Sequence, residues 1–196
     1  MRRNPSTVVI LSGEASGQLL ASIGQSMNVA LIETGDEGID GAASALRRAG
    51  GITAPYVLVR GDPLAAVARA WQGMWDVTHE SGDPASFELQ AAEVLAAWRA
   101  GRFELPDYYL VLAPAVVPGD NPVPDFYLGP LRSARPNRVT VAAAAEPSQQ
   151  AAEVMRVLGS LRHGPWWPPL DQIIETARGF YPGSLAEANL TGITSP

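Results

Sequence analysis

The chain of 196 residues contains neither lysine nor cysteine. Its 14 basic side chains are therefore all arginines, and with 20 acidic side chains the formal net charge is −6. The lack of lysine excludes a Schiff-base lysine and a lysine on a nucleotide phosphate, and the lack of cysteine excludes thiolate catalysis, disulfides and cysteine metal sites. Two histidines, His79 and His163, remain for imidazole chemistry. Without clustered carboxylates they are too few to predict a metal site.

Long apolar runs are also lacking. No stretch approaches the roughly 18 apolar residues of a membrane span, and Val8 to Leu11 is too short for a signal peptide. We therefore expect a cytoplasmic protein without membrane insertion. The acidic balance argues against nucleic acid as a partner, because neutralising phosphates requires a basic face. A hydrophobic fraction of 46% is typical of a globular chain and predicts a single domain over 1–196.

Short β-branched runs, typical of buried strands, alternate with segments whose apolar residues recur at helical spacing. We expect five strands, at 7–11, 29–32, 56–59, 108–112 and 138–142, with a further short strand at 126–128. We expect six helices, at 19–27, 39–49, 63–75, 84–98, 148–161 and 170–180. This alternation predicts an α/β fold: a three-layer sandwich around a mostly parallel, doubly wound sheet.

Proline marks several boundaries in this pattern. Asp62-Pro63 and Asp83-Pro84 each predict a helix N-cap followed by proline at the first helical position. The segment 113–136 is rich in proline and is interpreted as a long surface excursion, and 184–196 is expected to form a flexible tail.

The loop after the first strand is the first candidate binding site. In an open parallel sheet, ligands bind outside the carboxyl ends of the strands, and a following helix offers free N–H groups to an anion. Gly13, Ser16, Gly17 and Gln18 are the candidate ligand-binding residues of this loop. Neither the three-glycine dinucleotide fingerprint nor a Gly-Lys-Ser/Thr ending is present, so a tight strand-to-helix turn remains the alternative.

Three stretches resemble the MinD/ParA-type partitioning ATPases. Thr7 to Asp36 resembles the opening strand, P-loop, helix and strand of that family. Pro106 to Ala115 resembles the strand that ends in an aspartate near the magnesium, and Asn137 to Leu161 resembles a later strand, turn and helix. The three stretches cover less than half of the chain. The resemblance implies a P-loop-like or Rossmann-like domain with a nucleotide at the first loop.

The chain departs from the family at its functional positions. Gln18 stands in the place of the phosphate-binding lysine, although arginine is used freely elsewhere in the chain, and Glu14 lies near the place of the second signature lysine. Leu19 replaces the magnesium-binding hydroxyl, and Ala113 falls where the strand-end aspartate belongs. A phosphate cradle without these groups cannot neutralise the transferred phosphoryl group. We therefore expect a degenerate relative without catalytic residues, binding no cofactor or a nucleotide, that acts as a regulatory or interaction partner in an assembly.

Two other functions remain open. Glu33 and Asp36 follow the second strand and are candidate ligand-binding carboxylates; together with His79 they would suit a small-molecule enzyme, although Asp36 can equally cap the next helix. The third possibility is a purely structural subunit.

Two groups of residues are candidates for partner binding. Arg132, Arg135 and Arg138 cluster around one turn and would suit an anion, RNA or an acidic partner, or form an ordinary solvated loop. Trp166 and Trp167 precede two prolines and would suit an interface, or a hinge whose rings cover the fold. We expect a protein partner or a homo-oligomer.

Overall fold

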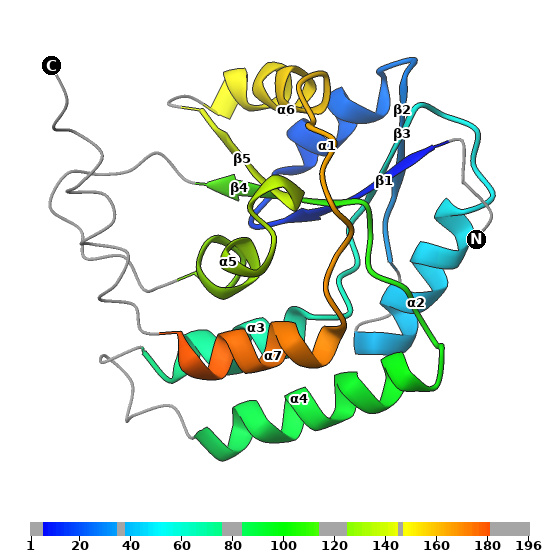
Figure 1. The fold of residues 1–196 in the computed structure, drawn as a ribbon. Helices are drawn as coiled ribbons and strands as arrows, with labels where there is room; N and C mark the ends of the chain where they lie inside the picture. Colours follow the sequence, from blue (N-terminus) through cyan, green and yellow to red (C-terminus); the bar gives the residue numbers. More distant parts are fainter. Residues whose placement is uncertain (1–5, 35–37, 76–83, 114–124, 145–146, 181–196) are drawn as a thin grey trace, which may run out of the picture.

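Five parallel strands form the centre of the structure, a computed structural model that describes residues 6–34, 38–75, 84–113, 125–144 and 147–180 (Figure 1). The strands are β1 (Thr7–Ser12), β2 (Val29–Ile32), β3 (Tyr56–Val59), β4 (Tyr108–Ala113) and β5 (Val139–Ala143). Their order in the sheet is β2-β3-β1-β4-β5, with every neighbouring pair parallel. The five strands predicted from the apolar runs are confirmed, each to within one residue at either end.

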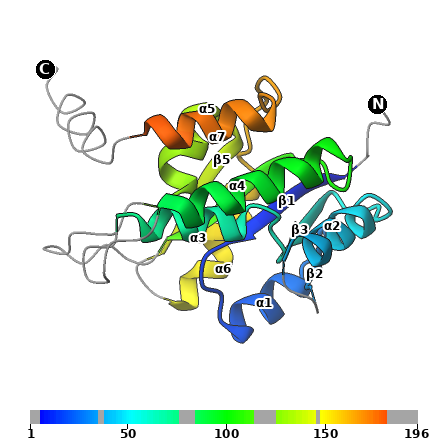
Figure 2. The same cartoon turned by 90° about the horizontal axis from the view of Figure 1, so that it is seen from below.

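Seven α-helices are present in the described part of the chain. They are α1 (Gly17–Gly24), α2 (Gly38–Ala49), α3 (Ala65–Gly73), α4 (Pro84–Arg99), α5 (Arg132–Ala134), α6 (Gln150–Leu158) and α7 (Leu170–Gly179). One helix more than expected is found, because α5 is a turn of only three residues. Figure 1 shows α1 and α6 above the sheet and α2, α3, α4 and α7 below it, and Figure 2 gives the view from below. The predicted three-layer α/β sandwich is therefore confirmed, whereas its P-loop-like or Rossmann-like character remains a prediction.

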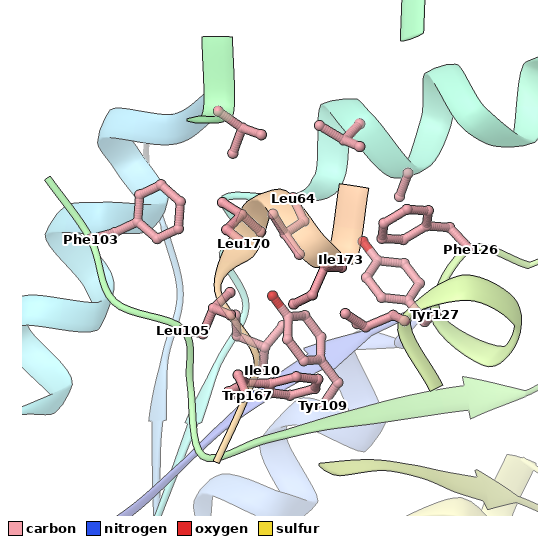
Figure 3. Close-up of a cluster of buried hydrophobic side chains, with 14 of the residues drawn as sticks. Ile10, Leu64, Phe103, Leu105, Tyr109, Phe126, Tyr127, Trp167, Leu170 and Ile173 are labelled. Atoms are coloured by element: carbon pink, nitrogen blue, oxygen red, sulfur yellow. The ribbon is translucent and has the colours of Figure 1, made fainter. Parts of the chain in front are cut away.

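The two faces of the sheet bury separate apolar cores. Alternate side chains of a strand point to opposite faces, so Val9 and Leu11 of β1 pack with α1 and α6 while Ile10 packs with the helices of the other layer. Both Val9 and Ile10 are completely buried. The larger core also contains Tyr109 and Tyr127, whose rings Figure 3 shows among its buried side chains.

The prediction of a short strand at 126–128 is wrong. Phe126 precedes a π-helical turn, η1 (Tyr127–Leu131), which leads directly into α5. The Asp125 carboxylate accepts the backbone N–H groups of Tyr127 and Leu128, at 2.7 Å and 3.0 Å, and so caps a helical turn. Phe126 then packs edge-on against the ring of Trp71. A local cap and tertiary packing thus override the strand propensity of these aromatic residues.

Two expected helix ends are also corrected. The first helix was expected to extend to Met27, but α1 ends at Gly24 and Met27 is 98% exposed, because the chain must turn at Ser26 to enter β2. Asp62 was expected to cap a helix starting at Pro63, but α3 begins at Ala65. The Asp62 carboxylate does accept the N–H of Leu64, yet its other hydrogen bonds lie elsewhere in the fold.

Several expectations fall on segments outside the described residues. Pro84 begins α4 as predicted, whereas its proposed cap Asp83 lies outside the description. Of the excursion at 113–136, residues 114–124 lie outside it, as does the expected tail at 184–196. Within the described ranges, no helix combines the length and hydropathy needed to cross a bilayer.

Candidate functional site

The carboxyl end of β1 is the point at which the chain connections diverge. β1 lies between β3 and β4 at the centre of the sheet. The chain leaves β1 toward α1 on one face, whereas α3, which follows β3, belongs to the other face. In open α/β sheets such a divergence leaves a crevice in which ligands bind. The residues that follow β1 and β3 are therefore the first to inspect.

The β1–α1 loop places the predicted residues Gly13, Ser16, Gly17 and Gln18 on the surface. All four are exposed. Gly13 has a positive φ of 97°, and a Cβ atom there would lie 2.7 Å from the carbonyl oxygen of Leu112 in β4. The Ser16 hydroxyl accepts the N–H of Leu19 at 3.1 Å and so caps α1. The loop is thus a tight turn pressed against β4, with one of the free N–H groups of the helix already satisfied.

Residues after β3 continue this packing along the carboxyl edge. The Arg60 guanidinium donates to the carbonyl of Gly13 at 2.9 Å, which joins the loops after β3 and β1. A Cβ atom on Gly61 would lie 2.3 Å from a methyl carbon of Thr34 and 3.3 Å from the Cα atom of Ala42, so a larger residue would require the Thr34 side chain to move. The turn after β3 therefore contacts the turn after β2 and the turn after β1, and the turn after β1 also contacts β4.

A partly buried group of polar side chains, the Asp62 cluster, lies beside these turns and consists of Ser12, Asp62, Tyr109 and Tyr127. The Asp62 carboxylate accepts the Tyr109 hydroxyl at 3.0 Å and the Tyr127 hydroxyl at 2.6 Å. A side-chain hydrogen bond also links Ser12 to Tyr127. The cluster therefore connects β1, β4, η1 and the turn between β3 and α3.

Burial controls the protonation of this cluster. It raises the pKa of Asp62 against the opposing effect of the hydrogen bonds from Tyr127, Leu64 and Tyr109. Burial also raises the pKa of Tyr109 and of Tyr127 well above their ordinary values, and the nearby Asp62 carboxylate acts in the same direction. Both hydroxyls therefore remain protonated donors at neutral pH. The hydrogen bonds to Asp62 therefore attach η1 to the carboxyl edge of the sheet.

The sequence reasoning missed Arg60, Gly61 and the partners of Asp62. It treated Asp62 only as a helix cap, since the residues nearest in the chain supply a complete explanation of that kind. One signal was available in the sequence: Arg60, Gly61 and Asp62 directly follow a predicted buried strand. In a doubly wound sheet, functional side chains gather at the ends of such strands.

The structure describes one member of the predicted carboxylate site, Glu33, and the strand that precedes it is not adjacent to β1 in the sheet. Glu33 is exposed after β2, and β3 lies between β2 and β1. The backbone carbonyl of Glu33 accepts a hydrogen bond from Arg48 at 3.2 Å. Asp36 and His79, the other members of that site, lie outside the described residues. Within the described part of the chain, histidines and carboxylates do not gather in groups of three or more that could hold a metal ion.

The predicted arginine group lies near the amino ends of β4 and β5. Arg138 is 8% exposed and donates to the carbonyls of Asp107, Gly164 and Pro165, at 3.0, 2.9 and 3.1 Å. Its guanidinium lies 5.0 Å from the ring centroid of Tyr108 and 4.9 Å from that of Trp166. Arg138 thus has an evident structural role, whereas Arg132 is exposed.

The two adjacent tryptophans differ in their surroundings. Trp167 is 6% exposed and donates its indole N–H to the carbonyl of Pro106 at 2.7 Å. Trp166 is 41% exposed, and its carbonyl accepts a hydrogen bond from Arg135 at 2.6 Å. Of the pair, Trp166 is the residue that a partner can reach.

Comparisons of the chain with protein-family models, with curated proteins and with solved structures find no match.

Proposed function

We propose that this chain is a non-catalytic α/β domain with a P-loop-like carboxyl edge, which serves as a regulatory or interaction partner in an assembly. The observation that carries the proposal is the placement of Leu19. If the β1–α1 loop corresponds to a P-loop, position 19 is that of the hydroxyl that binds magnesium. Leu19 is instead 4% exposed and packs in the core shared by β1, α1 and α6.

The neighbouring position supports the same proposal. Gln18 is exposed at the start of α1, where a phosphate-binding side chain would face a ligand. Glutamine can donate a hydrogen bond to phosphate but brings no charge to neutralise it. The loop therefore retains backbone N–H groups and the nearby Arg60 for weak anion binding, without the groups that phosphoryl transfer needs.

The experiment measures phosphate release and equilibrium binding of ATP, ADP and GTP with magnesium. We expect no turnover. We also expect Gln18→Lys to tighten ATP binding by about tenfold, because it places a cation at the helix N-terminus that faces the phosphates. Gln25→Lys is the matched control, since it adds the same charge to an exposed position just beyond the other end of α1.

Two results would contradict this proposal. Wild-type turnover that is abolished by Gly17→Ala would establish catalysis, since a Cβ atom at Gly17 meets no heavy atom within 4 Å and leaves the fold unchanged. Equal effects of Gln18→Lys and Gln25→Lys would show that the loop is an ordinary turn rather than a phosphate cradle.

A further inference from the structure

The arginines near the amino ends of β4 and β5 form no ion pair with a described residue, a property that they share with Arg47, Arg48 and Arg60. Arg102, Arg156 and Arg178 each form an ion pair with a carboxylate. Arg135 and Arg138 donate instead to neutral backbone carbonyls, which satisfies their N–H groups without neutralising their charge.

Two exposed arginines add to this positive charge. Within the described ranges, neither Arg132 nor Arg162 forms a side-chain ion pair or hydrogen bond. Arg132 is the first residue of α5, and Arg135 follows the last residue of that helix. The carbonyl of Arg162 accepts the hydroxyl of Tyr108, the residue whose ring faces Arg138. The Asp107 carboxylate offsets part of the charge of Arg138.

Trp166 is held by several contacts within this group. Its ring rests on the Arg138 guanidinium, its carbonyl accepts from Arg135, and the carbonyls of the two preceding residues accept from Arg138. The residue nevertheless keeps 41% of its surface exposed. Figure 1 shows the connection that carries it, drawn in orange between α6 and α7. A fixed, exposed tryptophan loses little conformational entropy on binding.

We propose that these residues form a docking surface for an acidic segment of a partner protein. We call this surface the arginine–tryptophan face, and it consists of Arg132, Arg135, Arg138, Arg162 and Trp166. Trp166 is the apolar anchor and the exposed Arg132 and Arg162 contact the carboxylates of the partner, a combination typical of energetically dominant interface residues. This inference rests on the proposed function as an interaction partner and names the class of partner.

Charge favours a protein segment over nucleic acid. A nucleic-acid strand presents a long series of phosphates that many cations must neutralise, and the net charge of −6 opposes its approach. A short acidic segment needs only a few cations, which this face provides locally.

The test selects random peptides by mRNA display against the whole chain and measures the enriched peptides by fluorescence anisotropy. We expect the selection to favour aspartate and glutamate. Arg132→Glu/Arg162→Glu, and separately Trp166→Ala, should weaken binding by at least about tenfold. The control Arg69→Glu/Arg99→Glu should weaken it less than about twofold. It changes the net charge equally at two exposed arginines of α3 and α4 that form no ion pair within the described part of the chain.

Several outcomes would overturn this inference. They are a selection that enriches no peptide or no acidic residues, binding that survives Arg132→Glu/Arg162→Glu, and an equal loss in the control. Single-stranded oligothymidine that binds this face more tightly than the peptides would assign it to nucleic acid instead. Nucleotide turnover would contradict the absence of catalysis without affecting the peptide result, so the failures of the two proposals are distinguishable.

Discussion

Asp62 accepts hydrogen bonds from residues that are far apart in the chain. Tyr109 lies 47 positions away and Tyr127 lies 65 positions away, and both hydroxyls reach its carboxylate. Hydrogen bonds from these donors favour the charged carboxylate, whereas burial favours the protonated one. The raised pKa of Asp62 shows that burial is the stronger effect.

The raised pKa of Asp62 makes the free energy of unfolding depend on pH. Because the folded state holds the proton more tightly than the unfolded state, the stabilisation is complete below the unfolded pKa of about 4 and is lost as pH rises through the folded pKa. Asp62→Asn removes this titration. In urea denaturation across that window, the stability of the wild type minus that of Asp62→Asn should fall with increasing pH, by at most about 1.4 kcal/mol per pH unit.

Glu93→Gln is the control for the loss of one negative charge, since Glu93 is exposed on α4. A difference between the wild type and Asp62→Asn that stays constant over this window would contradict the assignment of the raised pKa to this carboxylate.

The two tyrosines explain why this cluster was not predicted from the sequence. Local patterns report the neighbours of a residue along the chain, and the sequence around Asp62 is that of a helix cap. Tyr109 was correctly placed in a strand and Tyr127 wrongly so, yet no local pattern indicates that both hydroxyls meet one carboxylate. The cluster exists only after β4 and η1 have packed against the turn between β3 and α3.

At the scale of elements, the turns at the carboxyl edge of the sheet are fixed by close packing. Gly13 combines a positive φ with a Cβ position blocked by the carbonyl of Leu112, whereas Gly17 has neither constraint. Gly13→Ala should therefore destabilise the protein by about 1–3 kcal/mol. Gly17→Ala should be neutral, or stabilising by about 0.5 kcal/mol, since it favours the first turn of α1. Urea denaturation of the two variants checks both values, and equal effects would contradict the geometry of the loop.

The accuracy of the element predictions follows from how much each element depends on local sequence. β2 and β3 match the predicted ranges because short continuous apolar runs, bounded by polar residues, proline and glycine, favour a buried strand. Phe126 and Tyr127 satisfy the same propensity, but Asp125 and the ring of Trp71 direct them into a helical turn. The end of α1 was misplaced because Met27 continued the apolar spacing beyond the point where the chain must turn into β2.

At the scale of the whole molecule, the connection between α6 and α7 links the two helical layers. It leaves α6 on one face of the sheet and enters α7 on the other, past the amino ends of β4 and β5. Side-chain hydrogen bonds fix it there, from Tyr108 to Arg162, from Trp167 to Pro106 and from Arg138 to Gly164 and Pro165. The sequence showed only a break at the prolines, because these contacts come from other parts of the chain.

Arg138→Lys tests how far this linkage depends on one side chain. Lysine keeps the charge but cannot reach three carbonyls with a planar fork or stack between Tyr108 and Trp166, so we expect a loss of about 2–3 kcal/mol in urea denaturation. Hydrogen exchange should accelerate at residues 161–167 more than in the sheet, because the connection loses its attachment before the core does. Arg162→Lys, at an exposed position, should change neither measurement. An unchanged exchange rate in Arg138→Lys would mean that Trp167 and Tyr108 suffice to hold the connection, with Arg138 dispensable to it.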